Sequence, residues 1–263
     1  MRVAGLIVGR TLAAVREVAK AGMTTAELDQ VAREHIAAAG ATSSFLGYDG
    51  GFGLPPYPAV TCISVNSEIV HGIPGDRVLV DGDLVSIDFG VSKDGWHGDS
   101  AITFGIGQLT PELAELSEVT RQSMWAGIAA ARIGGRVGDI SAAVEGFVRA
   151  RRAGFGIVSD FTGHGIGTEM HQPPDVPNVG RAGRGELLVK GICLAVEPMI
   201  TSGSPVTATL EDDWTIVTRD GSAAAHWEHT VALTPAGAWV LTAEDGGEAE
   251  LGARGVKFGP LGD

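Results

Sequence analysis

The chain has 263 residues, of which 44% are hydrophobic and 19% are charged, and its formal net charge at pH 7 is −13. This composition is that of a folded globular protein, because disordered chains carry too few apolar residues to form a core. The acidic balance argues against charge-driven binding to DNA or to an anionic membrane surface. No apolar run approaches the roughly 20 residues of a membrane span, and no signal peptide is seen, so we expect a cytoplasmic protein.

Two helices are expected at the N-terminus. Apolar residues recur at helical spacing over residues 3–20, and Gly22 ends this pattern. Thr24 and Glu27 form a capping box for a second helix, which Gly40 ends. Residues 43–58 are rich in glycine and proline and predict a long irregular loop. A strand is expected over residues 59–65.

Residues 82–104 predict a β-hairpin with one aspartate on each strand. Alternation of apolar with small or acidic residues places Asp88 and Asp99 on inner faces. If a four-residue loop at 92–95 joins the strands, the two carboxylates are direct cross-strand partners. A two-residue turn at Asp94–Gly95 would shift the register by two and remove this opposition. A divalent cation would relieve the repulsion between the carboxylates, whereas the alternative is a solvated strand face.

The second half of the chain repeats this order of elements. Helices are expected over residues 110–132 and 139–152, followed by strands. In GDLVSID and GICLAVE, a glycine precedes a carboxylate, Asp88 or Glu197, by six residues. This match favours two α-β halves related by a pseudo-twofold axis. A further strand is predicted over residues 225–233, and the chain beyond Thr242 is expected to fray.

Four predicted strands therefore each offer one carboxylate: Asp88, Asp99, Glu197 and Glu228. Buried acids cannot all remain ionised without cations, and four of them with one or two histidines suit two divalent ions. The histidine is expected from FTGHGIGTEMHQPP, which contains His164 and His171. A phosphate-binding loop is a poor reading of GHGIG, because neither GxGxxG nor a following lysine is present. Cys62 and Cys193 form no CxxC pair, so a structural zinc site or disulfide is not indicated.

The short segments VHGIP, IDFG, DGWHGDSA, TGHGIG, VEPM and WEHT occur together in this chain. In combination they resemble the type I methionine aminopeptidases over about residues 1–242. The resemblance implies an α+β pita-bread fold, in which two pseudo-twofold-related halves surround a central curved antiparallel sheet. It also implies one catalytic domain over residues 1–245 and a Gly/Glu-rich C-terminal tail over residues 246–263.

The resemblance implies removal of the initiator methionine from nascent proteins and peptides with a small second residue. The implied reaction is attack on the scissile carbonyl by a hydroxide that bridges two divalent ions, Co, Mn, Fe(II) or Zn. The implied metal ligands are Asp88, Asp99, His164, Glu197 and Glu228, with Asp99 and Glu228 bridging. Glu197 would also shuttle the proton, His171 would polarise the carbonyl, and His71 would bind the peptide near the cleaved bond.

The methionine pocket is expected to contain Tyr57, Cys62 and Trp214. Met170 stands where the family usually has an aromatic residue, and it is included among the expected substrate-binding residues. His97, His226 and His229 lie near ligands in the sequence but are expected to have structural or surface roles.

The implied partners are N-terminal Met peptides and nascent chains, with a transient ribosome contact, no DNA, no membrane, and a monomeric state. One alternative is a proline-specific relative such as prolidase or aminopeptidase P, which shares the five ligands but carries a large N-terminal domain. Another is a non-catalytic ribosome or RNA adaptor of the same fold, which would be expected to lose ligands and gain basic surface.

Overall fold

A computed structural model describes residues 1–50, 53–151 and 154–261 of the protein. The helices are α1 (Arg2–Val18), α2 (Thr25–Ala39), α3 (Pro111–Ala130), α4 (Val137–Arg151) and α5 (Glu248–Ala253). The strands of the first half are β1 (Thr42–Ser43), β2 (Thr61–Val65), β3 (Glu68–Val70), β4 (Leu84–Lys93) and β5 (Trp96–Gly105). Those of the second half are β6 (Gly156–Ile157), β7 (Gly163–Gly165), β8 (Gln172–Val176), β9 (Cys193–Val196), β10 (Met199–Thr201), β11 (Thr207–Thr209), β12 (Ile216–Thr218), β13 (Ala224–His226), β14 (His229–Thr234) and β15 (Gly237–Val240).

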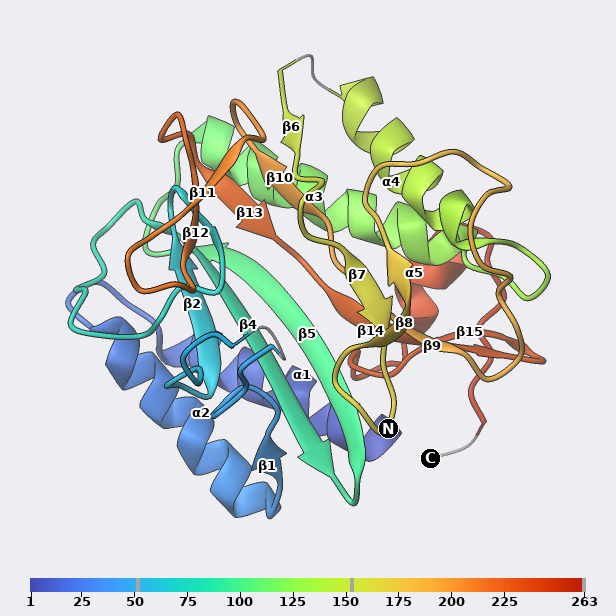
Figure 1. The fold of residues 1–263 in the computed structure, drawn as a ribbon, viewed down its shortest axis with the longest axis horizontal. Coiled ribbons are helices and arrows are strands. Elements are labelled where there is room, and N and C mark those ends of the chain that lie inside the picture. The colour runs from blue at the N-terminus through green and yellow to red at the C-terminus, as the bar shows by residue number, and fades with distance from the viewer. Residues whose placement is uncertain (51–52, 152–153, 262–263) are drawn as a thin grey trace.

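The two helix pairs pack near opposite ends of a central layer of antiparallel strands, with α1 and α2 at the lower left and α3 and α4 at the upper right of Figure 1. One sheet contains β1, β4, β2 and β5, and a second has the order β15-β14-β9-β7-β8. Two smaller sheets, β13-β10-β6 and β11-β12-β3, complete the layer among the described residues. No described helix combines the length and apolar character that a membrane crossing requires.

The four expected helices are present; α2 and α3 begin at their predicted caps, whereas α4 begins at Val137, two residues before the expected start. Thr24 and Glu27 make both hydrogen bonds of the capping box at α2, and Gly40 ends this helix in the left-handed conformation. At α3 the side chain of Thr110 accepts from the backbone N–H of Leu113, and Pro111 occupies the first turn. Part of the expected loop over residues 43–58 lies outside the described residues, at positions 51–52.

The hairpin differs from the four-residue-loop prediction. β4 and β5 are joined by a two-residue turn, in which Asp94 and Gly95 both have positive φ. Asp88 therefore pairs with Ala101, and Asp99 pairs with Gly90. The two aspartates are diagonal neighbours on one face and are not directly opposed.

The two halves are joined along β5 and the segment before β14. The backbone N–H of Glu228 donates to the carbonyl of Ala101 at 2.9 Å, and Ala101 N–H donates to Glu228 at 3.4 Å. Next to this pair, the hydroxyl of Thr230 donates to the carbonyl of Asp99 at 2.8 Å. The strand predicted over residues 225–233 is accordingly two strands, β13 and β14, that break at Trp227 and Glu228.

Two main apolar cores flank this seam. The core under α1 and α2 contains Val85, Ile87 and Phe89 of β4, all fully buried. The apolar face of β4 is thus covered by helices, and its other face carries Asp88. The second core lies between α3, α4 and the strands β9 and β14, and contains Leu194 and Val231.

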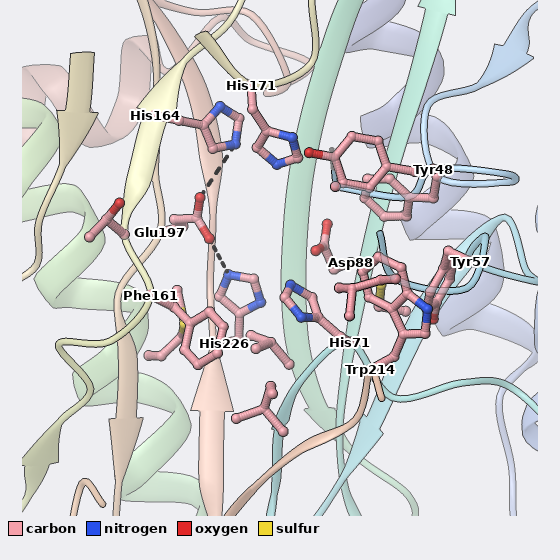
Figure 2. Close-up of a pocket in the computed structure, with 18 of the residues that line it drawn as sticks. Tyr48, Tyr57, His71, Asp88, Phe161, His164, His171, Glu197, Trp214 and His226 are labelled. Carbon is pink, nitrogen blue, oxygen red and sulfur yellow. Dashed lines mark ion pairs between the residues drawn. The ribbon is translucent and has the colours of Figure 1, made fainter. Parts of the chain in front are cut away.

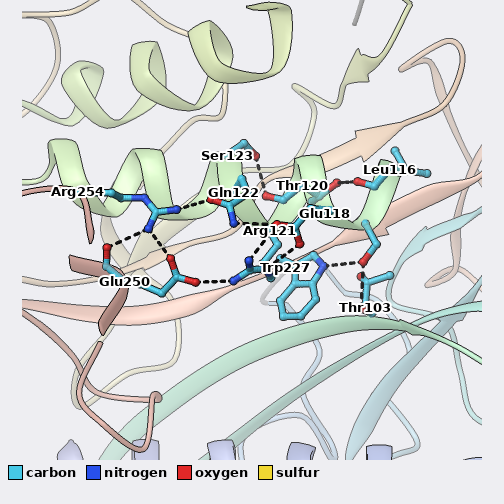
Figure 3. Close-up of polar contacts among 11 residues, drawn as sticks. Thr103, Leu116, Glu118, Thr120, Arg121, Gln122, Ser123, Trp227, Glu250 and Arg254 are labelled. Atoms are coloured by element: carbon cyan, nitrogen blue, oxygen red, sulfur yellow. Dashed lines mark hydrogen bonds and ion pairs between the residues drawn. The ribbon is translucent and has the colours of Figure 1, made fainter. Parts of the chain in front are cut away.

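The C-terminal segment is packed against the fold, contrary to the expectation that it frays. Leu251 of α5 is fully buried, and Ala238 forms a β-bridge with Phe258. Figure 3 shows the polar contacts that attach this segment to α3: Glu250 accepts from Arg121 at 2.6 Å and also pairs with Arg254. The division into a domain over residues 1–245 and a tail over 246–263 stays a prediction.

Truncation of Leu251 tests whether this segment contributes to stability. Leu251→Ala is expected to lower the free energy of unfolding by about 2–4 kcal/mol, because a fully buried leucine leaves a cavity when it is shortened. The matched control is Leu261→Ala, since Leu261 is 71% exposed and its loss should change stability by less than about 0.5 kcal/mol. Urea unfolding of both variants measures the difference, and equal stabilities would mean that the C-terminal segment is not part of the folded unit.

Candidate metal centre and peptide cavity

The predicted metal ligands converge from both sheets on the seam between the halves. Asp88 lies on β4, Asp99 on β5 and His164 on β7, whereas Glu197 directly follows β9 and Glu228 lies in the break between β13 and β14. Two groups of donor atoms lie within 4.8 Å of one another: Asp99, His164 and Glu228 in one, and Glu197, His226 and Glu228 in the other. Glu228 is common to both groups.

The carboxylate of Glu197 lies between two imidazole rings (Figure 2). Its Oε1 is 3.5 Å from Nε2 of His164, and its Oε2 is 3.4 Å from Nε2 of His226. Nε2 of His164 is also 3.9 Å from Oδ2 of Asp99. Asp88 also lines the cavity and lies to the right of Glu197 in the same view.

Burial raises the pKa values of all four acids, and repulsion by neighbouring acids adds to this for three of them. Removal from water raises the pKa of Asp99 to about 7. Burial, with the charges of the neighbouring acids added, also raises the pKa values of Asp88, Glu197 and Glu228. A group of acids that resists ionisation when empty is one that gains most from a bound cation.

The histidines of the site are neutral at physiological pH. Burial lowers the pKa values of His71 and His164 to about 4 and those of His171 and His226 to about 3. Nδ1 of His164 lies 2.9 Å from the carbonyl oxygen of Gly165. This hydrogen bond places the ring proton on Nδ1 and leaves the lone pair of Nε2 directed toward the acids.

The donor set fits divalent cations. Asp88 Oδ1, Asp99 Oδ1 and Glu228 Oε1 are buried and have no hydrogen-bond partner among the described residues. Buried polar atoms are almost always hydrogen-bonded, so unpartnered oxygens gathered at one place indicate a missing positive partner. Carboxylate oxygens and imidazole are ligands that divalent metals accept. We conclude that the site binds divalent metal.

A cavity of about 890 Å³ opens beside these residues. Tyr57, Cys62 and Trp214 line it, and so do His71 and His171. The ring of Tyr57 meets that of Trp214 edge to face at 5.3 Å, and its hydroxyl donates to the backbone carbonyls of Thr61 and Gly72. The pocket wall is thus fixed by backbone contacts.

Met170 is placed differently from the other expected pocket residues. It is buried in the apolar cluster that contains Phe45 and Trp214. Among the described residues that line the cavity, Phe45 is present and Met170 is not. A substrate side chain would therefore meet Phe45, with Met170 beneath the wall.

The two predicted peptide-binding histidines lie on different sides of the cavity. The ring of His171 is 4.3 Å from that of His164 and 5.1 Å from that of Tyr48, measured between centroids. The ring of His71 lies between Phe161 and Trp214, with centroid distances of 5.6 and 6.1 Å. Backbone φ of His71 is +60°, a conformation that non-glycine residues adopt rarely.

Sequence reasoning missed several residues of this cavity, among them Phe45, Tyr48, Phe161 and His226. Tyr48 lies in the glycine-rich loop, where no periodicity indicates which side chains point inward. His226 was assigned a structural or surface role, yet it is 1% exposed and contacts Glu197. Its position two residues before Glu228 on an alternating strand was a signal that could have identified it.

Comparisons with known proteins agree with this geometry. A family model described as Metallopeptidase family M24 matches residues 1–235. Methionine aminopeptidase 1 of Mycobacterium tuberculosis is 50% identical over 247 residues, which are 92% of this chain and 91% of that protein. The methionine aminopeptidase of Clostridium perfringens is 48% identical over 242 residues, with 92% and 94% coverage.

Solved structures support the same assignment. The crystal structure of methionine aminopeptidase from Thermotoga maritima matches with a TM-score of 0.88 and 39% identity, over 93% of this chain and 95% of that one. The enzyme from Rickettsia prowazekii matches with a TM-score of 0.87 and 35% identity, over 92% and 95%. The fold and site define a metallopeptidase with the pita-bread fold. The chain belongs to metallopeptidase family M24, and these relatives within it are methionine aminopeptidases.

The proline-specific alternative shares the fold alone. The X-Pro aminopeptidase of Thermotoga maritima matches with a TM-score of 0.69 and 22% identity. The match covers 92% of this chain but 59% of that one.

Proposed function

We propose that this protein removes N-terminal methionine from peptides and nascent proteins with a small second residue, in a metal-dependent hydrolysis. The observation that carries the proposal is the group of four acids, of which Asp99 and Glu228 are buried, with His164 beside a cavity that has aromatic and sulfur-containing walls. The methionine aminopeptidases reported above, at 35–50% identity over most of their length, support the same activity.

Two divalent ions would be held by Asp88, Asp99, His164, Glu197 and Glu228. Such ions supply a water of lowered pKa and a polarised carbonyl group. Oxygen-rich ligation with one imidazole suits Mn, Fe(II) or Co, and Zn is also accommodated. The number and identity of the ions are part of the proposal.

The side chains around the ligands perform the proton transfers and hold the peptide. Glu197, whose carboxylate lines the cavity next to His164, accepts the proton of the attacking water and delivers it to the departing amine. His171 is neutral at pH 7, and its ring N–H donates to the scissile carbonyl oxygen as negative charge develops there. His71, on the opposite wall, contacts the peptide near the cleaved bond.

The methionine side chain is accommodated by the walls formed by Phe45, Tyr57, Cys62 and Trp214. A thioether makes favourable contacts with aromatic rings, and the Cys62 thiol stays protonated because burial raises its pKa. The indole N–H of Trp214 donates to the carbonyl of Pro55 at 2.8 Å, which fixes the ring as part of the wall. We further propose a monomeric cytoplasmic enzyme that acts on nascent chains through a transient ribosome contact.

Peptide substrates test the proposal directly. The metal-loaded protein is expected to release methionine from Met-Ala-Ser and to cleave Met-Arg-Ser at least about 100-fold more slowly, because a large second side chain disturbs the placement of the scissile bond. Ala-Pro-Ala is the control for a proline-specific enzyme and should remain intact. Mass spectrometry with Mn(II), Co(II) or Fe(II) added singly to apo-protein measures the products. Cleavage of Ala-Pro-Ala alone would refute the proposal, and inactivity on all three peptides with every metal would favour a binding protein.

A further inference from the structure

His226 is held rigidly at the edge of the metal centre without being one of the predicted ligands. It ends β13, where it pairs with Met199 of β10. Its backbone N–H lies 3.0 Å from Oγ1 of Thr103, and its carbonyl accepts from the same hydroxyl at 2.6 Å. These contacts with β5 and β10 fix the position from which the imidazole projects.

The imidazole is directed at the carboxylate oxygen of Glu197 that faces away from His164. Nε2 of His226 is 3.4 Å from Oε2 of Glu197, and Nε2 of His164 is 3.5 Å from Oε1 (Figure 2). The side chain of His226 is 2% exposed, and its Nε2 has no hydrogen bond that meets standard geometry with any described residue. A buried ring nitrogen rarely lacks a hydrogen-bond partner, and Oε2 of Glu197 is close enough to become the partner of His226 Nε2.

The two histidines that flank Glu197 differ in how their ring protons are fixed. Nδ1 of His164 is hydrogen-bonded to the carbonyl of Gly165, so its Nε2 is a lone-pair donor suited to a metal. No contact of this kind to Nδ1 of His226 is found in the described part of the chain. The proton of His226 is therefore free to reside on Nε2, where a carboxylate oxygen accepts it.

We propose that His226 is a positioning residue for Glu197: its Nε2–H donates to Oε2 and thereby keeps Oε1 on the side of His164 and the metal. Second partners of this kind orient metal-ligating carboxylates and contribute to affinity for the ion. The inference rests on the proposed function, because it assigns Glu197 as a ligand and proton shuttle. It differs from a role of His226 as a sixth metal ligand, which would require a lone pair on Nε2.

Two substitutions separate these roles. In His226→Gln the side-chain amide retains an N–H donor, whereas His226→Leu retains similar bulk and has no donor. Loss of the donor is expected to weaken Mn(II) or Co(II) binding by about 10–100-fold and to lower kcat with little change in KM, because the methionine pocket is built from other elements. The glutamine variant should stay within about threefold of wild type in both quantities, since only the donor atom is required.

Isothermal titration of the apo-proteins with metal measures binding without relying on activity. His35→Gln, on α2 and outside the cavity lining, is the matched control for loss of an imidazole, and circular dichroism of the apo-proteins checks the fold. X-ray absorption of the wild-type Co(II) protein should count one imidazole for the pair of ions.

Three outcomes would overturn the inference: unchanged affinity and kcat in His226→Leu, a glutamine variant as weak as the leucine variant, or a second coordinated imidazole. If the protein binds metal but cleaves no methionyl peptide, the proposed function is wrong. The metal titrations would still test whether His226 positions Glu197.

Discussion

Replacement of Glu197 by glutamine is expected to lower kcat for Met-Ala-Ser by about 10²–10⁴-fold at saturating metal, the range typical for loss of a general base. The amide keeps the shape of the side chain but cannot accept the proton of the attacking water. KM should change by less than about threefold, because the walls that hold methionine come from other residues. Measuring kcat at saturating metal concentrations separates loss of the general base from weaker binding of the metal ion.

The same substitution makes the apo-protein a useful control. Glu197 is a buried acid whose pKa is raised by burial and by the charge of Asp99. Removing its charge relieves repulsion, so the apo-variant should be as stable as the wild-type apo-protein or more stable. A kcat within tenfold of wild type at saturating metal would show that Glu197 is not the proton acceptor.

Metal removal is expected to change how stability depends on pH. The acids have raised pKa values in the folded protein, so above pH about 4 the folded apo-state holds protons that the unfolded chain has released. Their contribution to stability is therefore lost as pH rises through the folded pKa values. The lowered pKa values of His71, His164, His171 and His226 act oppositely, and only below about pH 6.5.

Above pH 6.5, therefore, the acids and not these histidines determine how the stability of the site depends on pH. Between pH 6.5 and 8.5 the free energy of unfolding of the apo-protein should decrease. The decrease is up to about 1.4 kcal/mol per pH unit for each proton that the folded state holds and the unfolded chain does not. Bound metal removes this trend, because the carboxylates are already ionised and paired, and the stabilisation by metal should increase with pH. Urea unfolding of apo- and metal-loaded protein at three pH values measures the difference between their free energies of unfolding. Titratable groups remote from the site contribute equally to both forms, so their contributions cancel in this difference. A difference that is independent of pH would contradict the proposed ligand set.

Much of the fold was predictable because local signals were consistent. Thr24, Glu27 and Gly40 define α2 by chemistry that acts within one helical turn. The inward direction of Asp88 and Asp99 was also correct despite the wrong register. A shift of two residues preserves the alternation of a strand, so both side chains stay on the same face.

The errors arise where distant contacts override local pattern. The alternation over residues 225–233 predicts one strand, but backbone bonds between Glu228 and Ala101 interrupt it. Helix α5 is too short to be stable alone and depends on the burial of Leu251 and the contact of Glu250 with Arg121. The importance of His226 likewise depends on its approach to Glu197, which no sequence spacing specifies.

Because the metal centre lies where β5 meets Glu228, it forms only when both halves of the fold are present. Of the proposed ligands, Asp88 and Asp99 belong to the first half of the chain, and His164, Glu197 and Glu228 belong to the second. An N-terminal portion that folded early would hold two carboxylates and no imidazole ligand, which is too few to retain the ions. With the proposed ligand set, we expect peptide hydrolysis only after both halves have assembled, so a truncated or misassembled chain should be inactive.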